Sequence, residues 1–154
     1  MSNVIQALAD IAGNAVINEA LSAAATAISP GYLVEETSAG EVQEHATAAG
    51  SAQKLVALTN LPVGGGISDA YGAAETVRFG AFHSGQKVFL KLAATAPAVV
   101  IGDTLESAGD GTIRKALTDA ATDDTQRNSV VAYAVEAVDN SGGASEVFIE
   151  ARIA

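Results

Sequence analysis

Histidine is the side chain best suited to acid–base chemistry near neutral pH and to metal binding, and this sequence holds 2 of them, His45 and His83. They lie far apart along the chain, in segments without a zinc-binding pattern. A zinc site needs three or four converging ligands, and the chain has no cysteine. We therefore predict no zinc site and no catalytic role for either histidine, and we expect His83 to lie in a polar turn.

A group of carboxylates in "DAATDDT" is the other candidate for metal binding. Asp119, Asp123 and Asp124 could offer oxygen ligands to calcium. Their spacing does not match the calcium loop of an EF-hand, and no glutamate closes the loop. We predict a solvated acidic loop and no metal site.

Patterns that mark nucleophilic or nucleotide chemistry are also missing. The sequence contains no G-x-S-x-G elbow to expose a serine nucleophile. The loop "GGGISDAYG" lacks the G-x-G-x-x-G spacing and has no following Lys-Ser/Thr pair to bind phosphate. We predict no enzyme activity: catalytic residues none, cofactor-binding residues none, metal ligands none, and no cofactor.

The stretch "VVIGDTLESAGDGTIRKA", Val99 to Ala116, is broken twice by glycine and aspartate. Its start resembles the V-x-x-G-D-x-L turn of biotinyl and lipoyl carrier domains, which would make Lys115 the modified lysine, but the neighbours of Lys115 do not match. Glycine adopts backbone conformations that other residues avoid, and aspartate bonds nearby backbone groups. We predict that Gly102-Asp103 and Gly109-Asp110-Gly111 are turns that fold the sheet back on itself.

From Gly31 onward, short apolar runs separated by Gly, Asn, Asp and Ser predict β-strands. "YLVEE" and "KLVALTN" are two of them, and "LPVGGGISDAYGAAE" and residues 114–129 are expected to be loops. "TVRFGAF" and "KVFLKLA" are predicted to form a hairpin around "HSGQ". "SVVAYAVEAV" and "EVFIEARIA" are predicted to form the last hairpin, with apolar side chains on one face from Val147 to Ile153 and Glu146, Glu150 and Arg152 on the other.

Residues 1–29 differ from the rest because they are rich in alanine and carry few charges. Val4, Leu8, Ile11 and their neighbours up to Glu19 recur at helical spacing, which predicts a helix with a weak apolar stripe that ends before Pro30. Such a segment could pack on its own domain or lie on a neighbouring subunit. We expect an N-terminal arm over 1–29, helical or extended, and a β-rich domain over 30–154.

The amino-acid composition indicates which classes of binding partner the chain could have. The 154 residues carry 18 acidic and 8 basic side chains, a net charge of −10, and the basic residues are scattered. Binding to nucleic acid or to an anionic membrane needs clustered Lys and Arg, so we expect neither. The N-terminus lacks the features of a secretory signal, and no apolar run is long enough to span a bilayer; we expect synthesis in the cytoplasm.

The order of these segments resembles a known family. "VVIGDTLESAGDGTIRKA", a polar spacer, and "VVAYAVEAVDNSGGASEVFIEARIA" resemble the C-terminal halves of decoration, or structural cement, proteins of tailed-bacteriophage heads. The shared features are a G-D-x-L turn, an A-x-A-V-E-A strand and a last hairpin that ends in A-R-I. The resemblance covers about Ala98 to Ala154.

This resemblance implies a mainly β fold, a small antiparallel β-barrel or β-tulip-like sandwich. It implies a structural protein, made in the host cytoplasm, that sits on the outer capsid surface of the virion and bridges major capsid protein subunits after the shell expands. The partners would be the major capsid protein and further copies of the chain, with a homotrimer favoured. The rival functions are an adhesion or carbohydrate-binding module, in which Tyr71 would be the stacking aromatic, and a small hydrolase.

Overall fold

The computed structural model describes residues 16–23, 27–117 and 129–154 of the chain. These ranges contain ten β-strands and one short 3-10 helix, which confirms the mainly β fold. The elements are β1 (Val16–Leu21), β2 (Leu33–Glu36), β3 (Val42–Glu44), β4 (Leu55–Ala57), η2 (Leu61–Val63), β5 (Thr76–Ala81), β6 (Lys87–Leu92), β7 (Thr104–Ser107), β8 (Ile113–Lys115), β9 (Val130–Ala134) and β10 (Val147–Ile153).

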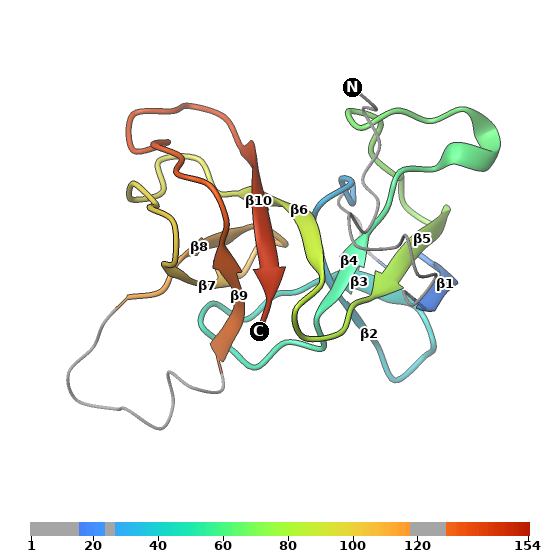
Figure 1. Cartoon of the computed structure of the whole chain (residues 1–154). Helices are drawn as coiled ribbons and strands as arrows, with labels where there is room; N and C mark the ends of the chain where they lie inside the picture. Colours follow the sequence, from blue (N-terminus) through green and yellow to red (C-terminus); the bar gives the residue numbers. More distant parts are fainter. Residues whose placement is uncertain (1–15, 24–26, 118–128) are drawn as a thin grey trace.

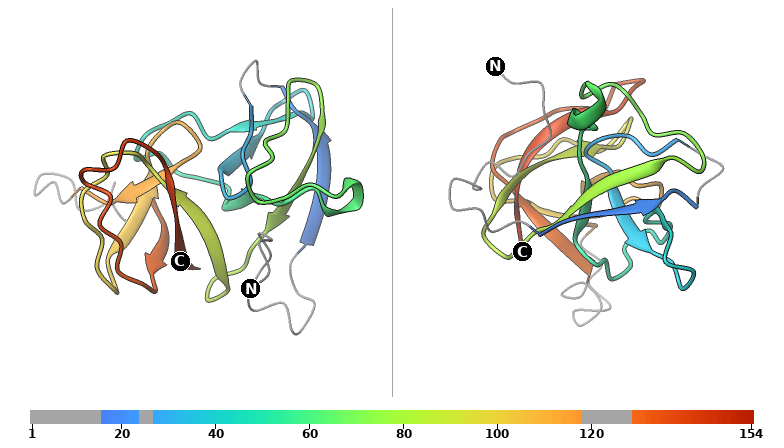
Figure 2. Two further views of the ribbon diagram at one scale, coloured as in Figure 1. Left: turned by 90° about the horizontal axis from the view of Figure 1, so that it is seen from above. Right: turned by 90° about the vertical axis from the view of Figure 1, so that its right-hand side faces the viewer.

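The strands form two units that lie side by side (Figure 1). The first is a five-stranded sheet with the order β1-β5-β4-β2-β3, in which all neighbours are antiparallel. Its edge strands meet at one end, where Ser22 forms a parallel bridge with Val42. The second unit is a closed barrel with the order β10-β6-β8-β7-β9. The predicted small barrel is therefore present, and the first half of the chain adds a sheet beside it (Figure 2).

Two apolar clusters hold these units together, and strands β2 and β4 belong to both. Side chains on successive strand residues point to opposite faces. Leu33 accordingly packs in the barrel cluster, whereas its neighbour Val34 packs in the sheet cluster. Val56 likewise packs in the barrel cluster, and Leu55 and Ala57 pack in the sheet cluster. The middle of the sheet is thus buried on both faces, and the barrel covers one of them.

The hairpin predicted for "TVRFGAF" and "KVFLKLA" is wrong. Both segments are strands, but β5 pairs with β1 and β4 in the sheet, whereas β6 pairs with β10 and β8 in the barrel. The turn between them is a link from one unit to the other, and Gly85 fixes it by donating its N–H to the Ile153 carbonyl. An alternating pattern of apolar and polar residues indicates that a segment is a strand, but it does not indicate which strand pairs with it.

The last hairpin is confirmed. Strands β9 and β10 pair antiparallel, with Ala151 opposite Ala134 and Ile153 opposite Ala132. Ile149, Ala151 and Ile153 are buried, as the alternation predicts.

The described part of the N-terminal arm takes the extended form. Val16–Leu21 are strand β1, which pairs along its whole length with β5. The helix that the sequence spacing predicts up to Glu19 is therefore wrong for this segment. The first two residues of β1 are β-branched and suit a strand. Ile28, further along, is fully buried in the sheet core. Residues 1–15 and 24–26, and the loop residues 118–128, lie outside the described residues.

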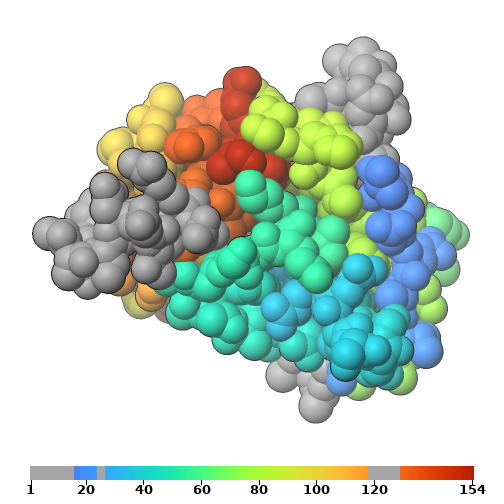
Figure 3. All heavy atoms as spheres, turned by 90° about the horizontal axis from the view of Figure 1, so that it is seen from below, coloured from blue at the N-terminus to red at the C-terminus, as the bar shows by residue number. Residues whose placement is uncertain are grey.

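Strand β1 forms an outer margin of the sheet unit (Figure 3). Five of its six residues are exposed. It therefore adds little to the core, and its pairing with β5 is what fixes it in place.

Candidate functional site

The turn that follows Val99 is built as the sequence predicts. Gly102 has φ +90°, in the left-handed region, and the Asp103 carboxylate accepts the Val100 N–H at 2.9 Å. The Gly102 N–H donates to the Ala134 carbonyl at 2.9 Å, which fastens the turn to β9. Lys115, the candidate carrier lysine, forms an ion pair with Asp103 at 2.8 Å. Its ammonium group therefore closes this turn.

The Asp103 pKa is held below its usual value, chiefly by the hydrogen bond from Lys115 and next by the Val100 N–H. A depressed carboxyl pKa stabilises the fold above the pKa of the unfolded chain, and this contribution disappears as the pH falls through the folded pKa. The D103N variant should therefore unfold at a slightly lower temperature than the parent at pH 7, because the pair is near the surface and worth little. Thermal unfolding across pH should show this difference closing at acid pH, once Asp103 is protonated in the folded parent; a constant difference would contradict this account.

The second turn, at Gly109-Asp110-Gly111, reverses the chain between β7 and β8. The Asp110 carboxylate accepts the Thr112 N–H at 3.1 Å, and β7 and β8 pair antiparallel around it. Gly111 also bonds the other unit: it donates its N–H to the His45 carbonyl, and its own carbonyl accepts the Leu33 N–H at 2.7 Å. The turn is therefore part of the junction between barrel and sheet.

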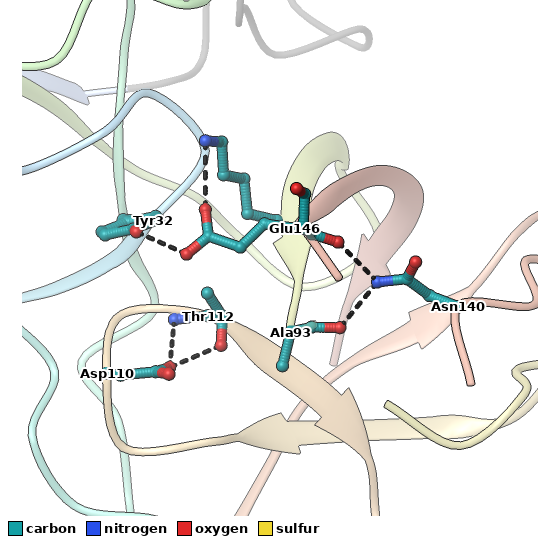
Figure 4. A network of polar contacts seen from close by, with 8 residues as sticks. Tyr32, Ala93, Asp110, Thr112, Asn140 and Glu146 are labelled. Carbon is teal, nitrogen blue, oxygen red and sulfur yellow. Dashed lines mark hydrogen bonds and ion pairs between the residues drawn. The ribbon is translucent and has the colours of Figure 1, made fainter. Parts of the chain in front are cut away.

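A polar network spans the same junction (Figure 4). Glu146 accepts hydrogen bonds from the Tyr32 hydroxyl at 2.7 Å and from Lys91 at 3.1 Å. The Lys91 ammonium nitrogen lies 5.5 Å from the ring centres of both Tyr32 and Phe148, within the range of cation–π attraction. Burial, and then the hydrogen bond to Glu146, raise the pKa of Tyr32 well above its usual range. The phenol therefore stays protonated and keeps the sheet bonded to the barrel.

His45 is buried at the junction, in a second polar network. Its Nδ1 lies 2.8 Å from Ser107 Oγ, and its Nε2 lies 3.2 Å from the Ser51 carbonyl and 3.7 Å from Glu35. A carbonyl only accepts, so Nε2 carries the proton that faces Ser51. In the neutral ring Nδ1 then accepts the Ser107 hydroxyl, and that oxygen in turn accepts the Gly109 N–H.

Serine, histidine and carboxylate together are the residue types of a hydrolytic triad, and the sequence did not predict this grouping. A nucleophile must reach its substrate, whereas Ser107 has 0% of its surface exposed. The network joins the segment after β3 to the start of the β7–β8 turn. Its role is therefore to hold these two segments together. His83 is exposed in a turn, as predicted, and its N–H donates to the Gln86 side chain.

The other predicted candidates do not form a site. Tyr71 is only 2% exposed and donates its hydroxyl to the Leu58 carbonyl at 2.7 Å, so it is not a surface aromatic. Asp119, Asp123 and Asp124 lie outside the described residues. Among the described residues no three metal-ligating side chains converge, and none of their helices is long and apolar enough to cross a membrane.

What the described surface does offer is exposed apolar side chains. They belong to three places: the edge strand β1, the 3-10 helix η2, and one end of the barrel. The residues are Val16, Ile17 and Leu21; Leu61 and Val63; and Val100, Ile101, Leu117 and Tyr133. The sequence could not single them out, because exposure depends on which strands become neighbours.

The fold defines the chain as an all-β protein in which a five-stranded sheet is joined to a closed barrel. Among solved structures, it is similar to the N base of the head fiber gp8.5 of bacteriophage phi29. The TM-score is 0.51 and the identity 13%, over 90% of this chain and 95% of that one, so the likeness is one of fold. No protein-family model matches the chain, and no curated protein matches its sequence.

Proposed function

We propose that this chain is a virion structural protein that binds the outer surface of an icosahedral phage head and stabilises it by bridging major capsid subunits. The observation that carries the proposal is the fold shared with the base of a phage head fiber over nearly the full length of both chains. The resemblance of residues 98–154 to head decoration proteins supports it independently.

The physical mechanism would be burial of surface between the chain and the shell. A specific interface needs on the order of 1,600 Å² in total, and exposed apolar side chains such as Ile101, 70% exposed, could contribute to it. A protein that binds only the assembled shell stabilises that shell by mass action. Because the lattice repeats the same binding site many times, the stabilising contributions of all bound copies would add.

Co-sedimentation with empty, expanded shells tests the proposal. The purified chain should pellet with the shells, saturate at a fixed number of copies per shell, and stay in the supernatant without them. Unexpanded shells serve as a control and should bind less. Failure to co-sediment at any concentration, or binding that never saturates, would contradict the proposal.

The N-terminal arm gives a further prediction, because we propose that the part of it before β1 reaches a neighbouring subunit. The deletion should remove residues 2–14 and leave β1 and Ile28 in place, since both belong to the sheet. We expect the shortened chain to keep its unfolding temperature and to bind shells more weakly, by roughly tenfold if about 1.4 kcal/mol of contact is lost. The same affinity for shells before and after deletion would show that the arm makes no such contact.

The rival function as a carbohydrate-binding module is weakened by the burial of Tyr71. Stacking on a sugar ring needs an exposed aromatic face, and Tyr71 packs in the sheet cluster instead. A glycan array separates the two functions, and we expect no glycan to bind.

A further inference from the structure

The outer face of the barrel brings an exposed aromatic residue next to an exposed cation. Tyr133 on β9 lies directly opposite Arg152 on β10 and opposite Thr104 on β7. Directly opposite residues of antiparallel strands share one face of the sheet. Tyr133 is 44% exposed, and Arg152 is also exposed.

Three apolar side chains lie at the same end of the barrel. Val100 and Ile101 are exposed in the turn that precedes β7. Two backbone hydrogen bonds hold this turn against the end of β9: the Gly102 N–H donates to the Ala134 carbonyl, and the Ala134 N–H donates to the Asp103 carbonyl. Leu117 is exposed just after β8, the strand that pairs with β7. We call the following residues the barrel-end patch: Val100, Ile101, Leu117, Tyr133 and Arg152.

The charge of Arg152 is unusual in this molecule. Of the 8 basic residues, Arg127 lies outside the described ranges, which leaves seven. Lys54 donates to the Ala154 carbonyl oxygen. Within the described part of the chain, Arg152 is the basic side chain that has neither such a bond nor a carboxylate partner. The other five form ion pairs with carboxylates: Arg78, Lys87, Lys91, Arg114 and Lys115.

One acidic segment of the chain is the β2–β3 hairpin. Between Tyr32 and Gln53 the sequence has no lysine or arginine. Glu36 and Glu41 flank the turn of this hairpin, and neither has a cation partner among the described residues. The hairpin belongs to the sheet unit and the patch to the barrel, so one molecule presents the two surfaces on different units (Figure 1).

We propose that the barrel-end patch binds the acidic β2–β3 hairpin of a second copy of this chain. Tyrosine and arginine are among the residue types that most often dominate binding energy in interfaces, and opposite charge selects the partner surface. Two different surfaces meet, so the contact is heterologous and forms a ring if the rotation closes. The proposal does not depend on binding to a phage head.

The test is a charge exchange in the full chain, read out by analytical ultracentrifugation. We expect the parent to assemble, and to assemble less at high salt, which screens the opposite charges. The R152E and E36R/E41R variants should each need a roughly tenfold or more higher concentration to assemble. The triple variant R152E/E36R/E41R carries the exchanged pair and should assemble again. The matched control V63S changes a side chain that is 76% exposed on η2, away from both surfaces, and should assemble like the parent.

None of the four substituted side chains is buried, so the variants should keep the parent's unfolding temperature. A monomeric parent at every concentration would overturn the proposal, as would an R152E variant that assembles like the parent. A triple variant that assembles no better than R152E alone would also overturn it. A chain that assembles in this way and ignores shells would leave the inference standing and contradict the proposed function.

Discussion

Replacing Gly111 with alanine is expected to lower the free energy of unfolding by about 4 kcal/mol. Gly111 has φ +78°, where a side chain is strained. A Cβ there would lie 2.6 Å from the Tyr32 ring and 3.1 Å from Glu44 Cβ. Both neighbours belong to the sheet unit, so the added methyl group would push the sheet away from the barrel.

Gly40 is a matched control for this substitution. Its φ is +76°, but apart from its own chain neighbours no residue has an atom within 4 Å of the position that a Cβ would take. The G40A variant should therefore lose only the backbone contribution, about 1 kcal/mol. Chemical denaturation of both variants measures the difference, and equal losses would show that the close approach at Gly111 does not matter.

Replacing His45 with alanine should cost about 3 kcal/mol, because it removes a buried ring and takes away the hydrogen-bond acceptor of the fully buried Ser107 hydroxyl. The H83A variant is the natural control, since His83 is exposed, and should change stability by less than about 0.5 kcal/mol. Denaturant unfolding measures both, and similar small losses would show that the buried network adds no stability.

A double-mutant cycle tests whether His45 and Ser107 act together. In H45A/S107A the hydroxyl is also removed, so the loss should be smaller than the sum of the two single losses. Strict additivity in denaturant unfolding would contradict a direct bond between the two side chains.

The sequence predicted the local elements of this fold better than their partners. The turns at Gly102 and Gly111 were predictable because glycine and aspartate have specific backbone preferences. The pairing partners of β5 and of β6 were not predictable, since a short polar segment between two strands can form a hairpin turn or a connection from one unit to the other. Strand β3 was not predicted at all, because it is short and two of its three residues are polar.

The residues that could form surfaces were harder to predict than the turns. Tyr133 and Arg152 are on different strands, and only the register of β9 against β10 makes them neighbours. The position of Tyr71 in a glycine-rich loop predicts an exposed aromatic, yet Tyr71 pairs with Ile28 and closes the sheet core. Burial at such positions depends on contacts between distant segments.

The most direct test of the central claim is the heat stability of expanded phage shells with and without saturating amounts of this chain. A protein that bridges capsid subunits should raise the temperature at which the shells come apart, by an amount that grows with its free concentration. Light scattering during heating records this temperature. The account predicts a higher temperature with the chain bound; bound chain with no change in the temperature would contradict it.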